Sequence, residues 1–402
     1  MLSRWKGSAT ANMRLRRCKT LWLEPREVAG FELERLFAGG TGVQLRMQWF
    51  ARAPHLEDAV PLDEDDVLLL GRLGSDAWQD AAPLAGEHGD ERLARLLEAG
   101  LLIGDAPAFA ASRAAEERYR AMHWNGLAST WHAASRWQGV DAAASVREAG
   151  VDTSAGLRAR HGVPPPALAT RGGSAEARVP LPRADRDGFD ALLDARTTCR
   201  NFDPSRALRL ADLAQVLERS VGVRGRVQAA DDFEVLKKTS PSGGALHPTE
   251  AYLLVRAVEG LAPGLYHYRA GDHALQPLPC EADALDRLAW LAVGGQPWFA
   301  NAHALVVLAP RFERNFWKYR DHPKAYRVTI LDVGHLSQTL QLAATTLGLG
   351  CFVTAAINEV DIERAFGMDG ISEAPLAVCG VGVRADTMAN SELDPNRAVW
   401  RG

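Results

Sequence analysis

The stretch "SPSGGALHP", residues 240–248, leads directly into the apolar run "TEAYLLVRAV". Two prolines, two serines and two adjacent glycines predict a loop, and the apolar run predicts a buried strand. Gly243 and Gly244 leave backbone N–H groups uncovered, while Ser240 and Ser242 add hydroxyl groups. A loop of this kind can accept a planar cofactor or an anion. Glycine-rich turns before strands are common, so the loop alone also fits a simple turn.

Outward from this loop, helical and strand patterns alternate over the second half of the chain. Helices are predicted in "LRLADLAQVLERSVG", "ADALDRLAWLAV" and "TILDVGHLSQTLQLAATTLG", and before them in "GFDALLDARTTCRNF", where the helix ends in a polar loop. The polar loop is the end of the first helical stretch along the chain. Strands are predicted in "AYLLVRAV", "HALVVLAPRF" and "PLAVCGVGVRAD", and the turn "AGDH" joins "LYHYR" to "ALQPLP" in a hairpin. This alternation predicts an α+β domain with a mixed sheet.

A second motif, "ARTTCRNFD", follows the first of these helices. Arg196 and Arg200 lie four residues apart with Thr197 and Thr198 between them, an arrangement suited to holding a phosphate. Arg384, at the end of the last predicted strand, is placed to join them. The same residues would also fit a solvated helix end, and the residues alone leave both readings open.

A third motif, "FWKYRDHPKAYR", contains Lys318 next to Tyr319. A lysine beside a tyrosine can supply a base for proton transfer. Spacing alone favours a plainer reading, in which this segment is a polar surface loop that leads into the long helix.

The front part of the chain differs from the back part in composition. Two strand-like runs and two helices, the second "ERLARLLEAGLLIGD", resemble a small winged helix–turn–helix, but its many acidic residues argue against DNA and favour a peptide ligand or a structural role. His123, Trp124, Trp131 and His132 could line a pocket, although packing between the domains is favoured. The expected divisions are a basic flexible tail (1–20), a winged-helix-like domain (21–106), a helical connecting region (107–160), a linker rich in proline, glycine and alanine (161–188) and the α+β domain (189–402).

Composition excludes several classes of protein. The chain has 402 residues, 47% of them hydrophobic, and a net charge of −4, which argues against a dedicated nucleic-acid binder. No apolar stretch is long enough to span a membrane, and the N-terminus lacks the apolar core of a secretory signal. The five cysteines are widely spaced and predict neither disulfides nor a metal site, which fits the cytoplasm. Cys199 lies among polar residues and could react, but an inert buried thiol is commoner.

Taken in order, these motifs resemble the flavin-dependent nitroreductase superfamily, and within it the SagB-type branch. The resemblance rests on "RTTCRNF", "PSGGALHPTEAYLLV", "GLYHYRAGDHAL", "WKYR" and "LDVGHLSQTLQLAATTLGLG", and it covers about residues 185–402. Members of this branch are FMN dehydrogenases that oxidise azolines to azoles in ribosomally made peptides. The resemblance therefore implies a nitroreductase-like fold, with a mixed, mainly antiparallel sheet flanked by helices, behind a winged-helix-like domain.

The resemblance also implies roles for individual residues. Lys318 and Tyr319 match the catalytic Lys–Tyr pair, and His247 is expected to face substrate. The residues implied to bind FMN are Arg196, Thr197, Thr198, Arg200, Ser240, Pro241, Ser242, Gly243, Gly244, Gln338, Val353, Thr354, Ala355 and Arg384.

The partners implied are a second copy of the chain, a precursor peptide whose leader binds the N-terminal domain, and a cyclodehydratase complex. Two other readings stay open at this point. One is an NAD(P)H-dependent reductase of nitro compounds, quinones or dehydroamino acids, and the other is a non-catalytic scaffold that binds a peptide.

Overall fold

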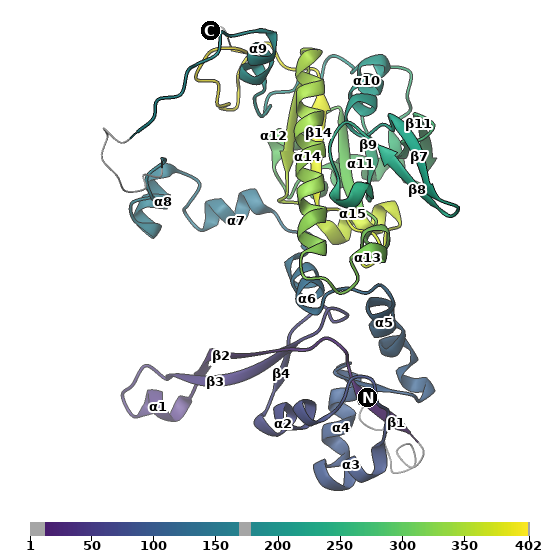
Figure 1. Cartoon of the computed structure of the whole chain (residues 1–402). Helices are drawn as coiled ribbons and strands as arrows, with labels where there is room; N and C mark the ends of the chain where they lie inside the picture. Colours follow the sequence, from purple (N-terminus) through teal and green to yellow (C-terminus); the bar gives the residue numbers. More distant parts are fainter. Residues whose placement is uncertain (1–12, 169–177, 401–402) are drawn as a thin grey trace. The chain divides into compact units, whose positions relative to one another are not determined.

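A computed structural model describes residues 13–168 and 178–400, which form two compact units (Figure 1). Among the described residues, unit 1 contains 13–136 and 312–327, and unit 2 contains 137–168, 178–311 and 328–400. The units therefore divide before residue 137 rather than at the expected linker. The physical reason is a set of hydrogen bonds: the N–H groups of Trp137 and Gly139 donate to Glu359 (2.8 Å) and Asp361 (2.7 Å).

Unit 1 has a small antiparallel sheet covered by helices. Its strands and helices are β1 (Arg14–Arg17), β5 (Gln79–Asp80), β6 (Leu102–Gly104), α2 (Glu64–Arg72), α3 (Ala81–His88) and α4 (Asp90–Glu98), with β1 in the middle of the sheet. Asp63 caps α2 in a capping box with Asp66. Leu15 on β1 is fully buried in the core, so residues 14–17 are not a flexible tail. Residues 1–12 of that expected tail lie outside the described residues.

The rest of unit 1 consists of a three-stranded antiparallel sheet and further helices. These elements are α1 (Leu33–Phe37), β2 (Trp22–Phe31), β3 (Val43–Arg52), β4 (Val60–Leu62), α5 (Ala110–Ala121), α6 (Gly126–Ser135) and α13 (Phe312–Lys318). Trp124 packs against Phe312 and Phe316 with ring centroids 4.7 and 4.6 Å apart. His132 Nδ1 lies 2.9 Å from the Tyr326 hydroxyl, so this histidine belongs to an aromatic core within unit 1.

Unit 2 is built on a six-stranded sheet in which every neighbouring pair of strands is antiparallel. Its strands, in spatial order, are β11 (Ala274–Leu278), β10 (Gly264–Arg269), β9 (Thr249–Val255), β12 (Ala304–Pro310), β14 (Ala377–Gly382) and β13 (Gly350–Thr354). The predicted strands and the predicted hairpin are present. Strand β13 and a second hairpin, β7 (Gly225–Ala230) with β8 (Phe233–Lys237), were not predicted.

Helices cover both faces of this sheet (Figure 1). The helices of unit 2 are α7 (Ala142–Glu148), α8 (Ser154–His161), α9 (Gly188–Ala195), α10 (Leu210–Ser220), α11 (Leu285–Ala292), α12 (Pro297–Ala300), α14 (Ala325–Thr346, from Val328 onward) and α15 (Glu359–Phe366). Along β9, Leu253 packs with α10 and α14, whereas Leu254 packs with α11. This alternation is that of a strand buried on both faces. Among the described residues, no helix is long and apolar enough to cross a membrane.

Candidate functional site

The segment after α9 is held against the edge of the sheet by backbone contacts. Cys199 N–H donates to the Cys351 carbonyl of β13 (2.9 Å), and a Cβ at Gly350 would lie 2.4 Å from the Cys199 sulfur. Only glycine at position 350 allows this close approach. The contact fixes the loop that carries the two arginines of the second motif.

Arg384 is hydrogen-bonded to this loop, and the two arginines that the loop carries contact other segments. Arg384 Nη2 donates to the Thr197 hydroxyl (3.1 Å), which joins the end of β14 to the motif. Arg196 Nη1 donates to Gln341 Oε1 of α14 (3.4 Å), and Arg200 Nη1 donates to the Ser391 carbonyl (3.0 Å). The structure therefore groups the three arginines around one short loop.

Glu392 is the anionic partner in this group, and the sequence did not reveal it. Its side chain is fully buried and pairs with the Arg384 guanidinium. The Arg200 N–H (2.6 Å) and the Trp400 indole N–H (2.9 Å) also donate to its carboxylate. Burial alone would raise the pKa of Glu392, but these hydrogen bonds and Arg384 lower it below its usual value. The carboxylate therefore stays ionised at neutral pH.

The glycine loop is fixed to helix α14 by a residue that the sequence reading also missed. Asp332 accepts hydrogen bonds from the Ser242 hydroxyl (2.5 Å) and from the Gly243 N–H (3.2 Å). The Ser240 hydroxyl lies 2.7 Å from that of Thr339. The Gly243 N–H is therefore not uncovered as expected, and the two serine hydroxyls also hold the loop on α14. Burial raises the pKa of Asp332.

At two positions of this loop, a side chain would be unfavourable. A Cβ at Gly243 would lie 2.1 Å from Val328 Cγ1, so the loop lies directly against the helix. Gly244 is exposed and has φ of +64°, a left-handed conformation that side chains disfavour. Pro241 is exposed as well, and His247 is half-buried with its N–H donating to the Ser242 hydroxyl (3.0 Å). The exposed backbone at Gly244 is the part of this loop that a planar group could approach.

The remaining predicted cofactor residues, Gln338 and 353–355, differ in how exposed they are. Gln338 is exposed on α14, and Gln341, one turn further on, is the glutamine that contacts Arg196. Val353 is half-buried and Ala355 exposed. Between them, the buried Thr354 hydroxyl accepts from the Gln296 side chain (3.1 Å), which fixes the end of β13.

The predicted catalytic pair lies in unit 1, at the end of α13. Lys318 is the last residue of this helix, and its Nζ lies 5.5 Å from the centroid of the Tyr319 ring. Lys318 is exposed and Tyr319 is half-buried. The segment that carries the pair is therefore partly helical, not only the polar loop of the plainer reading.

Cys199, the thiol that the sequence singled out, is buried in the structure. Burial raises the pKa of Cys199 to about 12, so this thiol is the inert kind. All five cysteines are free. Within residues 13–168 and 178–400, no group of three or more His, Cys, Asp or Glu side chains could hold a metal ion.

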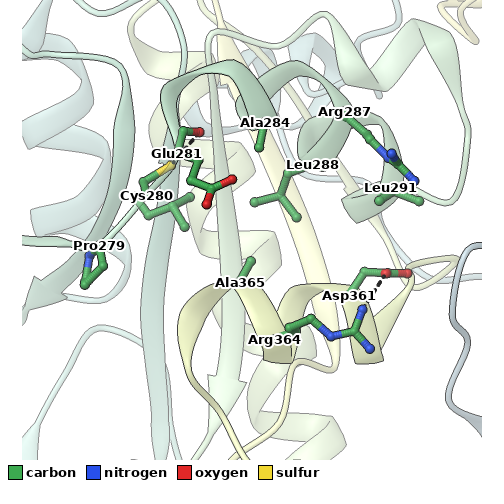
Figure 2. A pocket seen from close by; sticks show the side chains of 11 residues that line it. Pro279, Cys280, Glu281, Ala284, Arg287, Leu288, Leu291, Asp361, Arg364 and Ala365 are labelled. Atoms are coloured by element: carbon green, nitrogen blue, oxygen red, sulfur yellow. Dashed lines mark hydrogen bonds and ion pairs between the residues drawn. The ribbon is translucent and has the colours of Figure 1, made fainter.

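A separate cavity of about 710 Å³ opens in unit 2 between α11, α15 and the segment after β11 (Figure 2). Leu288 and Ala365 face its interior, and the ion pair of Asp361 with Arg364 (3.9 Å) lies on one side. Cys280, whose side chain is exposed, lies on the other side. None of the predicted site residues lines this cavity, so it is distinct from the arginine cluster and the glycine loop.

Comparisons with known proteins agree with the motifs. A model described as "Nitroreductase family" matches residues 193–383. The nitroreductase-type protein MJ1384 of Methanocaldococcus jannaschii is 30% identical over 204 residues, which are 51% of this chain and 95% of that protein. The microcin B17-processing protein McbC of Escherichia coli is 30% identical over 202 residues, 48% of this chain and 72% of that protein.

A third relative is the trifolitoxin-processing protein TfxB of Rhizobium leguminosarum bv. trifolii. It is 33% identical over 151 residues, which are 36% of this chain. The chain spans only 39% of the length of TfxB. The similarity in all three relatives covers about half of the chain or less.

Proposed function

The chain belongs to the nitroreductase family, and we propose that it is an FMN-dependent dehydrogenase that matures a ribosomally made peptide. The single observation that carries the proposal is that Arg384 is joined through Thr197 to the loop of unit 2 that carries Arg196 and Arg200. The names of the relatives McbC (microcin B17 processing) and TfxB (trifolitoxin processing) support the choice of substrate class.

The donor set of this cluster fits a phosphate group. Guanidinium groups and the Thr197 hydroxyl match phosphate oxygens in geometry and charge. Thr198 continues the same loop, whose backbone is fixed by β13. We assign the FMN phosphate and ribityl chain to this cluster, and the flavin ring to the exposed backbone at Gly244, Pro241 and residues 353–355.

The substrate proposed is a thiazoline or oxazoline ring in a precursor peptide. Oxidation to the azole removes a proton from the ring Cα and a hydride from Cβ. Bound FMN would supply the hydride acceptor, with molecular oxygen as the final electron acceptor. The Lys318–Tyr319 pair, whose side chains lie close together, would act as the single base that accepts the Cα proton. His247 would contact the substrate.

The partners proposed follow from the same membership. We propose that unit 1 binds the leader of the precursor peptide and that the protein acts in the cytoplasm. We also propose that it works with a cyclodehydratase, which forms the rings. A homodimer is supported by two exposed apolar side chains on α14, Leu331 (55% exposed) and Ile330 (38% exposed).

Purification followed by a visible spectrum and chromatography of the released cofactor tests this proposal. Stoichiometric FMN is expected, followed by oxidation of an azoline-containing peptide under air. A colourless protein that does not take up added FMN would refute it. Rapid anaerobic bleaching of the flavin by NADPH, without azoline oxidation, would instead indicate a reductase.

A further inference from the structure

Residues 389–400, which we name the clasp segment, lie against the arginine cluster in unit 2. Asn201 Nδ2 donates to the Asn390 carbonyl (2.8 Å), and the Ala389 N–H donates back to Asn201 Oδ1 (2.9 Å). The clasp segment is folded on itself by Asp394, which accepts from the N–H groups of Val399 (2.9 Å) and Trp400 (2.8 Å). It is therefore a built part of the cluster and not a loose end.

Glu392 is the centre of this contact. Its carboxylate receives donors from the loop, namely the Arg200 N–H (2.6 Å) and Asn201 Nδ2 (2.8 Å). The carboxylate also pairs with Arg384, which follows β14, and accepts a hydrogen bond from the indole N–H of Trp400. The Trp400 ring lies 5.6 Å from the guanidinium carbon of Arg384. One buried carboxylate thus joins two chain segments that both carry predicted phosphate ligands.

The charge of the cluster matches a phosphate once Glu392 is included. Three arginines and one glutamate leave two net positive charges around the loop. A phosphate monoester carries about −1.5 to −2 at neutral pH, so the cluster and the ligand are nearly neutral together. With Nη1 on Glu392 and Nη2 on Thr197, the planar guanidinium of Arg384 is fixed in one orientation.

We propose that Glu392 is a positioning residue for the phosphate of the cofactor: it holds Arg384 and the backbone of residues 200–201 in the geometry that binds phosphate. This inference rests on the proposed function. In this proposal the buried Glu392 carboxylate improves the binding of a second anion, the phosphate. It does so because the orientation that it gives Arg384 outweighs the repulsion between the two negative charges. Glu392 itself is not expected to touch the phosphate.

The test compares FMN with riboflavin, which lacks the phosphate. Dissociation constants are measured by flavin fluorescence for the wild type, Glu392→Gln and Glu392→Asp, with inorganic phosphate as a competitor against FMN. Glu392→Gln replaces the carboxylate with a neutral amide, which weakens the contacts that orient Arg384 and bind the Trp400 indole. FMN affinity should therefore fall about tenfold. Riboflavin affinity should not change, the inhibition constant of phosphate should rise, and Glu392→Asp should recover part of the loss.

The matched control is Asp386→Asn, which removes one nearby charge from an exposed side chain that does not contact Glu392. FMN binding that is unchanged or tighter in Glu392→Gln would overturn the inference and make Glu392 a competing anion. Equal loss of FMN and riboflavin affinity would overturn it as well, since a purely structural role affects both ligands. Wild-type protein that binds neither flavin would instead refute the proposed function. The Glu392 variants test only the inference about Glu392.

Discussion

Lys318 and Tyr319 are the residues on which the proposed chemistry depends, and their contact is local. The lysine amine lies 5.5 Å from the centroid of the neighbouring ring, so the two side chains can act together as one base. We expect Lys318→Ala and Tyr319→Phe to lower azoline oxidation about a hundredfold or more, because each removes a group that can accept the substrate proton. Turnover and bound FMN are measured on the same preparations, and FMN content should not change.

Lys324→Ala is the control for this pair, since Lys324 is also an exposed lysine of the segment that follows α13. Turnover in that variant should equal that of the wild type. Full activity in both Lys318→Ala and Tyr319→Phe would rule out the assigned roles while leaving the flavin site untouched.

Glu373 in unit 2 gives a prediction about pH and stability. Burial raises its pKa to about 7, aided by the nearby charge of Glu250, although both of its oxygens accept from the Tyr252 hydroxyl at 3.0 Å. The folded state therefore keeps a proton that the unfolded state releases above its usual pKa. It follows that this group lowers the free energy of unfolding as pH rises from about 4.5 to about 7.

Glu373→Gln should remove this penalty, because the amide oxygen still accepts from Tyr252 and never ionises. We expect the variant to be about 1–3 kcal/mol more stable than the wild type at pH 8 and nearly equal to it at pH 4.5. Urea unfolding at several pH values measures the difference, with the exposed Glu281→Gln as the control. A difference that does not depend on pH would contradict the raised pKa.

At the scale of elements, the glycine loop and α14 behave as one structure. Because a Cβ at Gly243 would lie 2.1 Å from Val328 Cγ1, Gly243→Ala should cost about 1–3 kcal/mol of stability. Val328→Ala removes the opposing methyl groups, so the double variant should lose less than the sum of the two single variants. Thermal or urea unfolding of the four proteins completes the cycle.

Gly188→Ala serves as the control for the cycle, since a Cβ there meets no atom within 4 Å. Strictly additive losses in the double variant would show that the loop does not press on α14. FMN affinity measured on the same variants reports whether the loop position matters for the cofactor.

The sequence predicted elements well where apolar periodicity was strong. The long helix was expected over 329–348 and spans Ala325–Thr346, and the predicted strands of unit 2 are present. The hairpin β7–β8 was missed because its strands are largely exposed and carry no buried alternation. Strand β13 was missed because residues 353–355 were interpreted only as part of the flavin site.

The same contrast holds for single site residues. Glycines and arginines were found from their motifs, but the groups that hold them were not. On α14, Gln338 is exposed on the side away from the buried Leu336 and Leu340, whereas Gln341 is itself buried. Asp332 and Glu392 are single polar residues whose partners are distant in the sequence, and only the folded chain brings them together.

For the whole molecule, the chain's division into units follows distant hydrogen bonds and not composition. Val140 N–H donates to Asn358 (2.7 Å), which ties the segment before the expected linker into unit 2. Residues 312–327 are likewise grouped with unit 1 by the aromatic packing of Phe312 and Phe316. A proline-rich stretch indicates where a chain is irregular, whereas contacts between distant residues decide which segments fold together.

The proposed homodimer is tested on helix α14 of unit 2. An exposed leucine next to an exposed isoleucine is costly in water, and the neighbouring Gly334 would let a second backbone approach closely. Leu331→Glu should therefore convert the dimer to a monomer in light scattering and lower FMN content, if both subunits contribute to the flavin site. Val227→Glu, at an equally exposed position on β7, should leave mass and FMN content unchanged. A Leu331→Glu protein that remains a dimer with full FMN would place the interface elsewhere on the molecule.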